Sequence, residues 1–300
     1  MSSEFHVSRR NTLGILIGSF LAGAGAVLAP AAHSASPLAS GKKGSLDPYD
    51  ADDFAVISRK LLYRGDDGLC FAWLKATKYA LVKSSLTPLH SMESGALFRI
   101  QTTTDGYDVT TLERTFYTAV GTDDLLDEWR NPLTGETLML KRGPVGPTTQ
   151  KYRRDGSLVL PKAYLGLDFE ATSSTRLANI HGDDIWLLVD SDAKVFRNGP
   201  DKPPFHVTEM RTTQARLSDA IKPKNNLVET SLSLHEVNSW PETMRMGDID
   251  GSVIIRGFGR KIFDFNKMPD SWLTKLRRIN PDIAADPVAA LDKTAAKFEQ

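Results

Sequence analysis

Apolar residues recur with a period of two through much of the chain between residues 54 and 264, in short runs separated by turn residues. Such alternation places the two sets of side chains on opposite faces of a β-strand. Asp105-Gly106 and Asp250-Gly251 are hairpin dipeptides, and Asp190-Ser191-Asp192 is predicted as a third turn. The pattern predicts strands over 54–63, 69–81, 96–103, 107–119, 136–142, 184–190, 193–198, 205–215, 227–237 and 252–264.

The order of these elements predicts the fold class. Consecutive strands without intervening helices favour antiparallel pairing, in a large curved sheet or in a β-barrel of lipocalin-like general shape. Residues 143–183 lack a clear period and are expected to hold a long loop over one end of the sheet. The C-terminus changes to helical spacing, which predicts two amphipathic α-helices over 270–279 and 286–298. These helices need a surface to cover.

The N-terminus has the order of an export signal. Arg9-Arg10 precedes a weakly apolar run from Leu13 to Ala29, and small residues follow. This order predicts a twin-arginine signal peptide over 1–35. A retained membrane anchor is the alternative, but a span needs about 20 apolar residues, and this run is short and loosened by glycine.

Export has consequences for location and organisation. The expected location is the periplasm, and the membrane is a partner only during export. Residues 36–53, rich in Ser, Pro, Gly, Lys and Asp, are expected to form a flexible arm. Residues 54–300 are then expected to form a single mainly-β domain that carries the two C-terminal helices.

Composition narrows the range of partners. Lys plus Arg and Asp plus Glu both number 37, so no basic excess exists to neutralise phosphates, and nucleic acid is not an expected partner. The single cysteine, Cys70, excludes an internal disulfide and lies among apolar neighbours, as a buried inert thiol does. The histidines show no metal-ligand spacing, and nucleotide-binding motifs are absent, so neither a metal nor a cofactor is expected. The oligomeric state is left open.

Several motifs resemble a known family. They are Leu62-Tyr63-Arg64-Gly65-Asp66-Asp67-Gly68, Trp73, Arg114-Thr115-Phe116-Tyr117-Thr118, the segment 127–136, Trp240-Pro241 and Gly259-Arg260-Lys261. Together they resemble the domain of unknown function 1838 family of bacteria and fungi, which often follows twin-arginine signals. The resemblance covers roughly residues 50–290 and implies one domain. Because the family has no known activity, it supplies no catalytic residues.

Three places in the chain are candidates for chemistry. Arg114 alternates with Leu112 and Phe116, and an arginine on an apolar face must be paired or bind an anion. It is therefore either a structural partner of Asp127 or Glu128, or a clamp for a carboxylate or phenolate inside a cavity.

The segment 127–136 and the strand around His235 are the other two. A turn alone would explain the run Asn131-Pro132-Leu133-Thr134-Gly135. The alternative is a pocket rim formed by Asp127, Glu128, Trp129 and Arg130. Adjacent acids on a strand face opposite sides, so at most one of Asp127 and Glu128 points inward. His235 shares a face with Ser231 and Ser233, which either faces solvent or lines the interior and supplies a general base.

Three hypotheses about function remain. The first is an exported protein that binds a small, partly apolar molecule, with Arg114 as anchor and a wall formed by Tyr63, Trp73, Phe116, Trp129 and Trp240. The second is a cofactor-independent enzyme (an isomerase, cyclase, lyase or hydrolase) on the same scaffold. In that case His235, Asp127 or Glu128 would be the acid or base, and Arg114 the oxyanion partner. The third is a structural or interaction protein that uses its C-terminal helices.

Overall fold

The computed structural model describes residues 44–140, 143–154, 157–160, 163–164, 167–196 and 203–298. The predicted signal peptide and the first part of the predicted arm lie outside these residues. In the part of the chain that is described, no helix combines the length and apolar character needed to cross a membrane.

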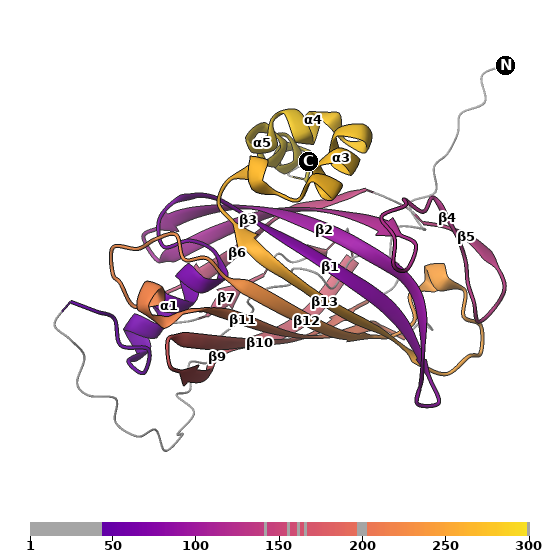
Figure 1. The fold of residues 1–300 in the computed structure, drawn as a ribbon, viewed down its shortest axis with the longest axis horizontal. Coiled ribbons are helices and arrows are strands. Elements are labelled where there is room, and N and C mark those ends of the chain that lie inside the picture. Colours follow the sequence, from indigo (N-terminus) through magenta and orange to yellow (C-terminus); the bar gives the residue numbers. More distant parts are fainter. Residues whose placement is uncertain are drawn as a thin grey trace.

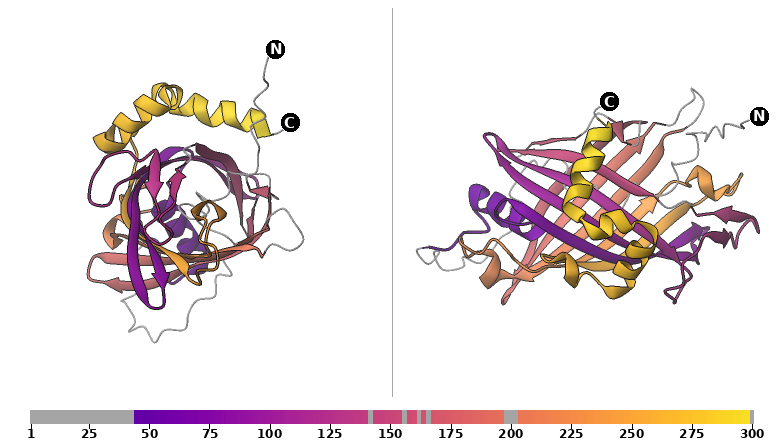
Figure 2. Two further views of the ribbon diagram at one scale, coloured as in Figure 1. Left: turned by 90° about the vertical axis from the view of Figure 1, so that its right-hand side faces the viewer. Right: turned by 90° about the horizontal axis from the view of Figure 1, so that it is seen from above.

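The chain is mainly β and forms one strongly curved antiparallel sheet, a half-barrel, as the alternation predicts (Figures 1 and 2). The strand order is β7-β6-β3-β2-β1-β13-β12-β11-β10-β9-β8, and within the described residues the end strands β7 and β8 pair only with β6 and β9. A separate hairpin joins β4 and β5. The strands are β1 Gly68–Val82, β2 Ser85–Thr103, β3 Gly106–Thr118, β4 Glu128–Arg130, β5 Thr137–Met139, β6 Pro144–Arg153, β7 Leu158–Val159, β8 Ala163–Tyr164, β9 Leu167–His181, β10 Asp184–Val195, β11 Phe205–Arg216, β12 Ser231–Asn238 and β13 Ser252–Ile262.

The prediction of a strand over 54–63 is wrong, because this segment is the helix α1, Ala51–Leu62. Asp50 caps it by accepting hydrogen bonds from the backbone N–H groups of Asp52 and Asp53. Phe54, Ile57 and Leu61 are all buried, and their spacing puts them on one helical stripe. That stripe packs on the inner face of β10 and β11. The helix therefore begins inside the predicted arm and covers one end of the half-barrel.

The long middle of the chain also differs from its prediction. Residues 143–183 hold β6, β7, β8 and all of β9 in place of a long loop. Asp190-Ser191-Asp192 is not a turn, because β10 runs without a break from Asp184 to Val195. In it Ser191 is buried against Ser173 of β9, and its two acidic neighbours point to the other face. Three consecutive polar residues thus predict a turn, although here they alternate between the two faces of one strand.

The C-terminus forms three helices, α3 Asp270–Ile279, α4 Pro281–Ala285 and α5 Pro287–Phe298. The prediction over 270–279 matches α3, the prediction over 286–298 begins one residue before α5, and α4 was not predicted. These helices lie on the outer side of the sheet, over β2, β3 and β6 (Figures 1 and 2), and their apolar cluster includes Phe71 of β1. Trp272 comes so close to Gly95 that a Cβ atom there would lie 2.3 Å from the indole ring, so the contact requires glycine.

A buried ion pair joins α3 to the sheet. Glu93 of β2 accepts hydrogen bonds from Lys275 Nζ at 2.7 Å and from Trp73 Nε1 at 2.9 Å, and Ser271 Oγ also donates to it. Arg114 lies under the same helices, with its Nε donating to Asn280 Oδ1 at 2.5 Å and its guanidinium over the Phe116 ring. The outer face of β1–β3 is therefore occupied by the attachment of the C-terminal helices.

Candidate functional site

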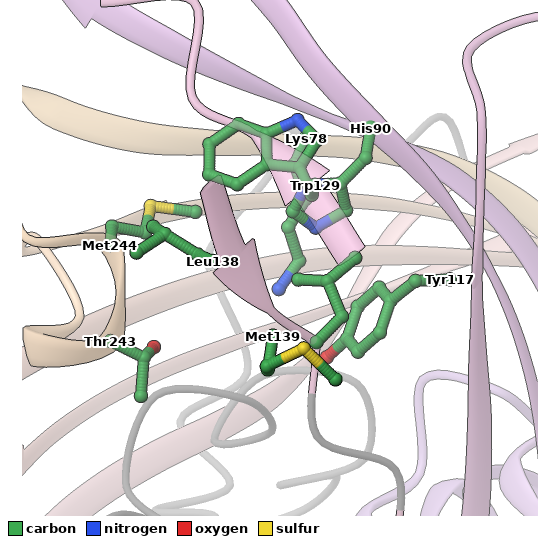
Figure 3. A pocket seen from close by; sticks show the side chains of 9 residues that line it. Lys78, His90, Tyr117, Trp129, Leu138, Met139, Thr243 and Met244 are labelled. Carbon is green, nitrogen blue, oxygen red and sulfur yellow. The ribbon is translucent and has the colours of Figure 1, made fainter. Parts of the chain in front are cut away.

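A pocket lies at the end of the half-barrel that carries the β4–β5 hairpin (Figure 3). Its cavity volume is about 20 Å³, measured as the space open to the centre of a water-sized sphere, and the unfilled space around it, including open solvent at the mouth, is about 340 Å³. Lys78 of β1, His90 of β2 and Tyr117 of β3 come from the inner face of the sheet. The remaining lining comes from the hairpin and the 3₁₀-helix Glu242–Met244, and consists of Trp129, Leu138, Met139, Leu140, Thr243 and Met244.

Aromatic contacts organise the inner end of this pocket. The His90 ring meets Tyr117 edge to face with 5.0 Å between centroids and Trp129 with 5.2 Å. Trp129 Nε1 donates to the Leu89 carbonyl at 2.9 Å, which fixes the indole, and Lys78 Nζ lies 5.2 Å from the centre of the Tyr117 ring. The pocket is thus an aromatic and methionine-lined space with an amine and an imidazole at its inner end.

The turn in segment 127–136 holds the pocket wall in place. Asn131 is fully buried, and its side chain accepts from the Leu133 N–H at 3.0 Å and donates to the Met244 carbonyl at 3.0 Å. Gly135 has φ of +75°, a conformation that favours glycine. The segment is therefore both a turn and part of the pocket wall, because the turn holds Trp129 in position.

Polar side chains continue from the pocket across the inner face of the sheet. Positions paired strand to strand from β2 to β9 form one row, which we call the inner polar row: His90, Lys78, Ile255, Glu236, Glu209, Ser191 and Ser173. Only Ile255 in this row is apolar, and all of its members are buried. Because His90 and Lys78 also line the pocket, the row begins in the pocket.

Burial dominates the electrostatics of this row. It raises the pKa of Glu209 to about 8, which Arg211 opposes and Glu236 reinforces. Burial raises the pKa of Glu236 to about 7, against the hydrogen bond from Asn238 and the charge of Lys78. The pKa of Lys78 is lowered to about 8 by burial, which Glu236 and Glu113 oppose.

His90 completes the electrostatics of the pocket. Burial, with a smaller contribution from the charge of Lys78, lowers the pKa of His90 well below its ordinary 6.5, so the imidazole is neutral at pH 7. Two groups that line the pocket and two more in the same row therefore have perturbed proton affinities, a pattern that is typical of functional sites.

The predicted site residues are divided between the two faces of the sheet. Trp129 lines the pocket, and Asp127 and Glu128 precede it as exposed residues. Trp240 packs against the same apolar cluster as Trp129, and its Nε1 donates to the Ile249 carbonyl at 2.8 Å. Tyr63 is buried toward the α1 end, where its hydroxyl lies 2.7 Å from that of Tyr152.

The structure places the other predicted residues on the outer face. Arg114, Phe116 and Trp73 lie beneath the C-terminal helices. Arg114 donates a hydrogen bond to Asn280 there, where the two alternatives were a pair with Asp127 or Glu128 and an anion clamp in a cavity. Leu112 and Phe116, which alternate with Arg114 along β3, are buried as expected, but they are buried against the C-terminal helices. His235 also faces outward, half-buried, because its strand partners Met210 and Arg256 lie on the outer side.

Sequence reasoning missed the titratable residues of the interior. Glu236 shares its face of β12 with Leu232 and Leu234, and Glu209 follows Val207 on the inner face of β11. An acid on an apolar face is the same signal that singled out Arg114, so both were detectable. Lys78 gave the same signal, because it stands between Ala76 and Ala80 on the buried face of β1. His90 did not, because it lies beside a bulge in β2, where Leu89 has no register partner.

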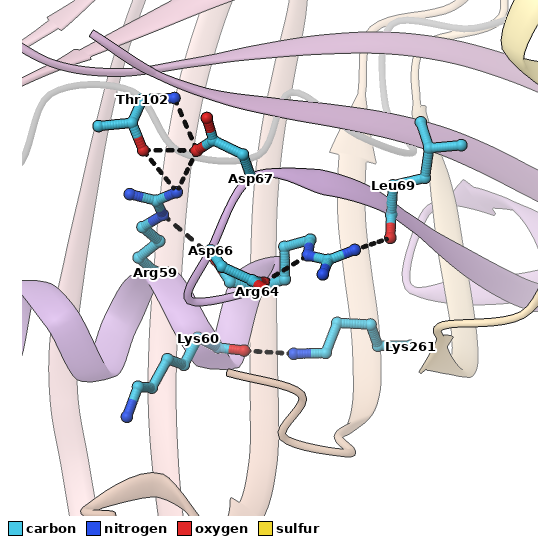
Figure 4. A network of polar contacts seen from close by, with 8 residues as sticks. All are labelled: Arg59, Lys60, Arg64, Asp66, Asp67, Leu69, Thr102 and Lys261. Atoms are coloured by element: carbon cyan, nitrogen blue, oxygen red, sulfur yellow. Dashed lines mark hydrogen bonds and ion pairs between the residues drawn. The ribbon is translucent and has the colours of Figure 1, made fainter. Parts of the chain in front are cut away.

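The motif 62–68 attaches α1 to β1 (Figure 4). Arg64 donates to Asp66 Oδ1 at 2.7 Å and to the Leu69 carbonyl at 2.8 Å, and Asp67 accepts from the backbone and the hydroxyl of Thr102. Buried Lys261 donates to the carbonyls of Lys60 and Leu61 at the end of α1. These residues therefore fasten the helix to the sheet.

Fold and site together define a half-barrel protein whose inner face carries a row of buried polar residues, two of which line an end pocket. Residues 70–297 match the family described as "Protein of unknown function (DUF1838)", and the chain belongs to this family, as its motifs indicated. No curated protein matches the chain. Among solved structures, a DUF1329 family protein from Desulfovibrio piger ATCC 29098 aligns at 8% identity with a TM-score of 0.21, over 73% of this chain and 94% of that one. A likeness at this level carries no argument about fold or function.

Proposed function

We propose that this protein binds a small, partly apolar molecule in the end pocket, with the apolar part against Trp129, Tyr117 and the methionines and the polar part toward Lys78 and His90. The observation that carries the proposal is the continuity of the pocket with the inner polar row, through two residues that belong to both. Ligand sites are typically apolar and aromatic spaces with a few well-placed polar groups.

Blocking the mouth of the pocket should abolish binding. Thr243 is half-buried and lines the pocket, so Thr243→Trp places an indole there without removing a core residue. In a thermal-shift screen of small amphipathic molecules, we expect ligands that raise the melting temperature of the wild type to leave Thr243→Trp unchanged. Thr212→Trp is the matched control, since Thr212 lies on the outer face of β11. Equal shifts in both variants would place the binding elsewhere.

A second candidate function is catalysis of proton transfer without a cofactor. The specific observation is the pair Glu209 and Glu236, which lie opposite each other on β11 and β12 and have raised pKa values of about 8 and 7. A carboxyl group with a pKa near 7 is suited to act as a general acid or base. Turnover that is lost in Glu236→Gln, measured at a ligand concentration that still saturates the pocket of the variant, separates this function from binding alone.

We also propose that the protein works in the periplasm after twin-arginine export, which the order of residues 1–35 supports. Replacing Arg9 and Arg10 together with lysine should leave unprocessed protein in the cytoplasm, because the translocation machinery recognises the arginine pair. Fractionation and immunoblotting of the producing bacterium measure this directly. Normal appearance of the mature chain in the periplasm would refute the proposal.

A further inference from the structure

We propose that Glu209, Glu236 and Asn238 form an inner subsite that takes a protonated amine, so that the ligand of the end pocket carries an ammonium group. This inference rests on the proposed binding function and adds the chemical class of the ligand. It assigns a role to polar groups that the fold itself leaves unused.

The first argument is the set of acceptors that these residues present. Glu236 Oε2 accepts a hydrogen bond from Asn238 Nδ2 at 3.1 Å. Within the described part of the chain, both carboxylate oxygens of Glu209, Oε1 of Glu236 and Oδ1 of Asn238 have no hydrogen-bond partner. Glu209 is 1% exposed and Glu236 0%. Because buried polar atoms in native proteins are nearly always paired, this group of acceptors requires a partner.

The second argument is the geometry of the group. Glu209 and Glu236 are direct partners across β11 and β12, and Asn238 lies two residues along the same face of β12. Facing positions in an antiparallel pair hold their Cβ atoms about 5 Å apart, so both carboxylates reach one point. An ammonium group has three donors and no acceptor, which matches several converging oxygens. No three His, Cys, Asp or Glu side chains of the described residues gather as metal ligands.

The third argument is the balance of charge around the subsite. Glu113 on β3 adds a third carboxylate, whereas Arg211 on β11 and Lys78 on β1 are the cations that act on the pair. The carboxyl groups of Glu209 and Glu236 nevertheless hold their protons more tightly than usual, so these cations do not offset their burial. A further positive charge between them would let both ionise.

The end pocket is the proposed route of access to the subsite. Lys78 lines the pocket and interacts electrostatically with Glu236, and both stand in the inner polar row with Ile255 between them. In the proposed complex the apolar part of the ligand lies against Trp129, and its head extends past Ile255 toward Glu236, two strands from Lys78. At low pH the positive charge of Lys78 repels an ammonium group and weakens its binding. This repulsion disappears as the pH rises and Lys78 loses its proton.

Binding of an amine should consequently be linked to protons. Alkylamines remain charged up to a pH of about 10, as lysine does. Raising the pH from 6 to 9 ionises Glu236 and Glu209 and neutralises Lys78, and all three changes favour an ammonium guest. The affinity for an amine should therefore rise about tenfold or more over this range, with release of a proton on binding near pH 7.

The test compares n-octylamine, 1-octanol and octanoate by isothermal titration calorimetry on the wild-type chain at pH 6, 7.5 and 9. We expect octylamine to bind about tenfold more tightly than the alcohol at pH 7.5. Titration in buffers of different ionisation enthalpy measures the released proton. Glu209→Gln and Glu236→Gln keep the shape of the side chains and should each cost about tenfold for the amine. Asp190→Asn, an exposed carboxylate of the outer face, should leave its affinity unchanged.

The outcomes separate this inference from the proposed function. If octanol or octanoate binds as tightly as octylamine and Thr243→Trp abolishes that binding, the pocket stands and the amine subsite is refuted. An octylamine affinity that does not change with pH or in either Gln variant also refutes it. If none of the three probes binds at millimolar concentration, the amine inference fails, and the binding function is then judged by the ligand screen with Thr243→Trp.

Discussion

Lys275→Met should lower the free energy of unfolding by about 3 kcal/mol or more, because it leaves the buried carboxylate of Glu93 without its counter-charge. Lys275 Nζ lies 2.7 Å from Glu93 Oε2, with side-chain exposures of 7% and 1%. The hydrogen bonds from Trp73 and Ser271 remain but carry no full charge. Urea unfolding monitored by circular dichroism gives the free energy.

Lys75→Met is the matched control for that experiment. Lys75 lies on the outer face of β1, and its ion pair with Asp123 is 2.8 Å long but exposed. An exposed pair contributes about 0–1 kcal/mol, so its loss should be small. If Lys275→Met cost no more than Lys75→Met, the C-terminal helices would not depend on the buried pair.

Glu209→Gln should become progressively more stable than the wild type as pH rises from about 5 to 8. The folded-state pKa of Glu209 is raised from 4.5 to about 8, chiefly by burial, so the folded chain binds this proton more tightly than the unfolded one. The stability that this proton contributes is complete below the unfolded pKa and is lost as pH rises through the folded pKa. Glutamine has no such loss, and the difference should reach the order of 3 kcal/mol at pH 8.

Asp66→Asn provides the control of opposite sign. A hydrogen bond from Arg64 lowers the pKa of Asp66 from 3.8, so its contribution is lost only at acid pH. Its difference from the wild type should stay constant between pH 5 and 8 in urea titrations. A constant difference for Glu209→Gln as well would show that this carboxyl group titrates as in water, against the account of the interior.

Much of the sheet was predictable because apolar and polar residues alternate along a strand whose two faces differ in burial. The strands over 69–81, 107–119, 205–215 and 252–264 and the helix over 270–279 all follow their patterns closely. α1 was missed because its charged first turn and apolar stripe fit a short strand almost as well, and only the Asp50 cap distinguishes them. The predicted turn at Asp190-Ser191-Asp192 was wrong because residues that favour turns can also lie within a strand that has a polar inner face.

The site was less predictable than the sheet, for a physical reason. Alternation separates the two faces of a strand but does not tell which face a helix covers. Arg114 and Phe116 satisfied every expectation for a buried face, yet α3 and α4 cover that face from outside. The inner face buries the ionisable side chains of Glu209, Glu236 and Lys78, residue types that ordinary hydrophobic patterning assigns to solvent. Only the register of the strands brings these residues into one row.

Native mass spectrometry of the protein purified from its own producing cells tests the central claim most directly. We expect part of the wild-type population to carry a small molecule that is released on denaturation. Thr212→Trp should carry the same added mass, and Thr243→Trp, with its indole across the pocket, should carry none. Retention of that molecule by Thr243→Trp, or a wild type that appears at the mass of the chain alone, would contradict a ligand site in the end pocket.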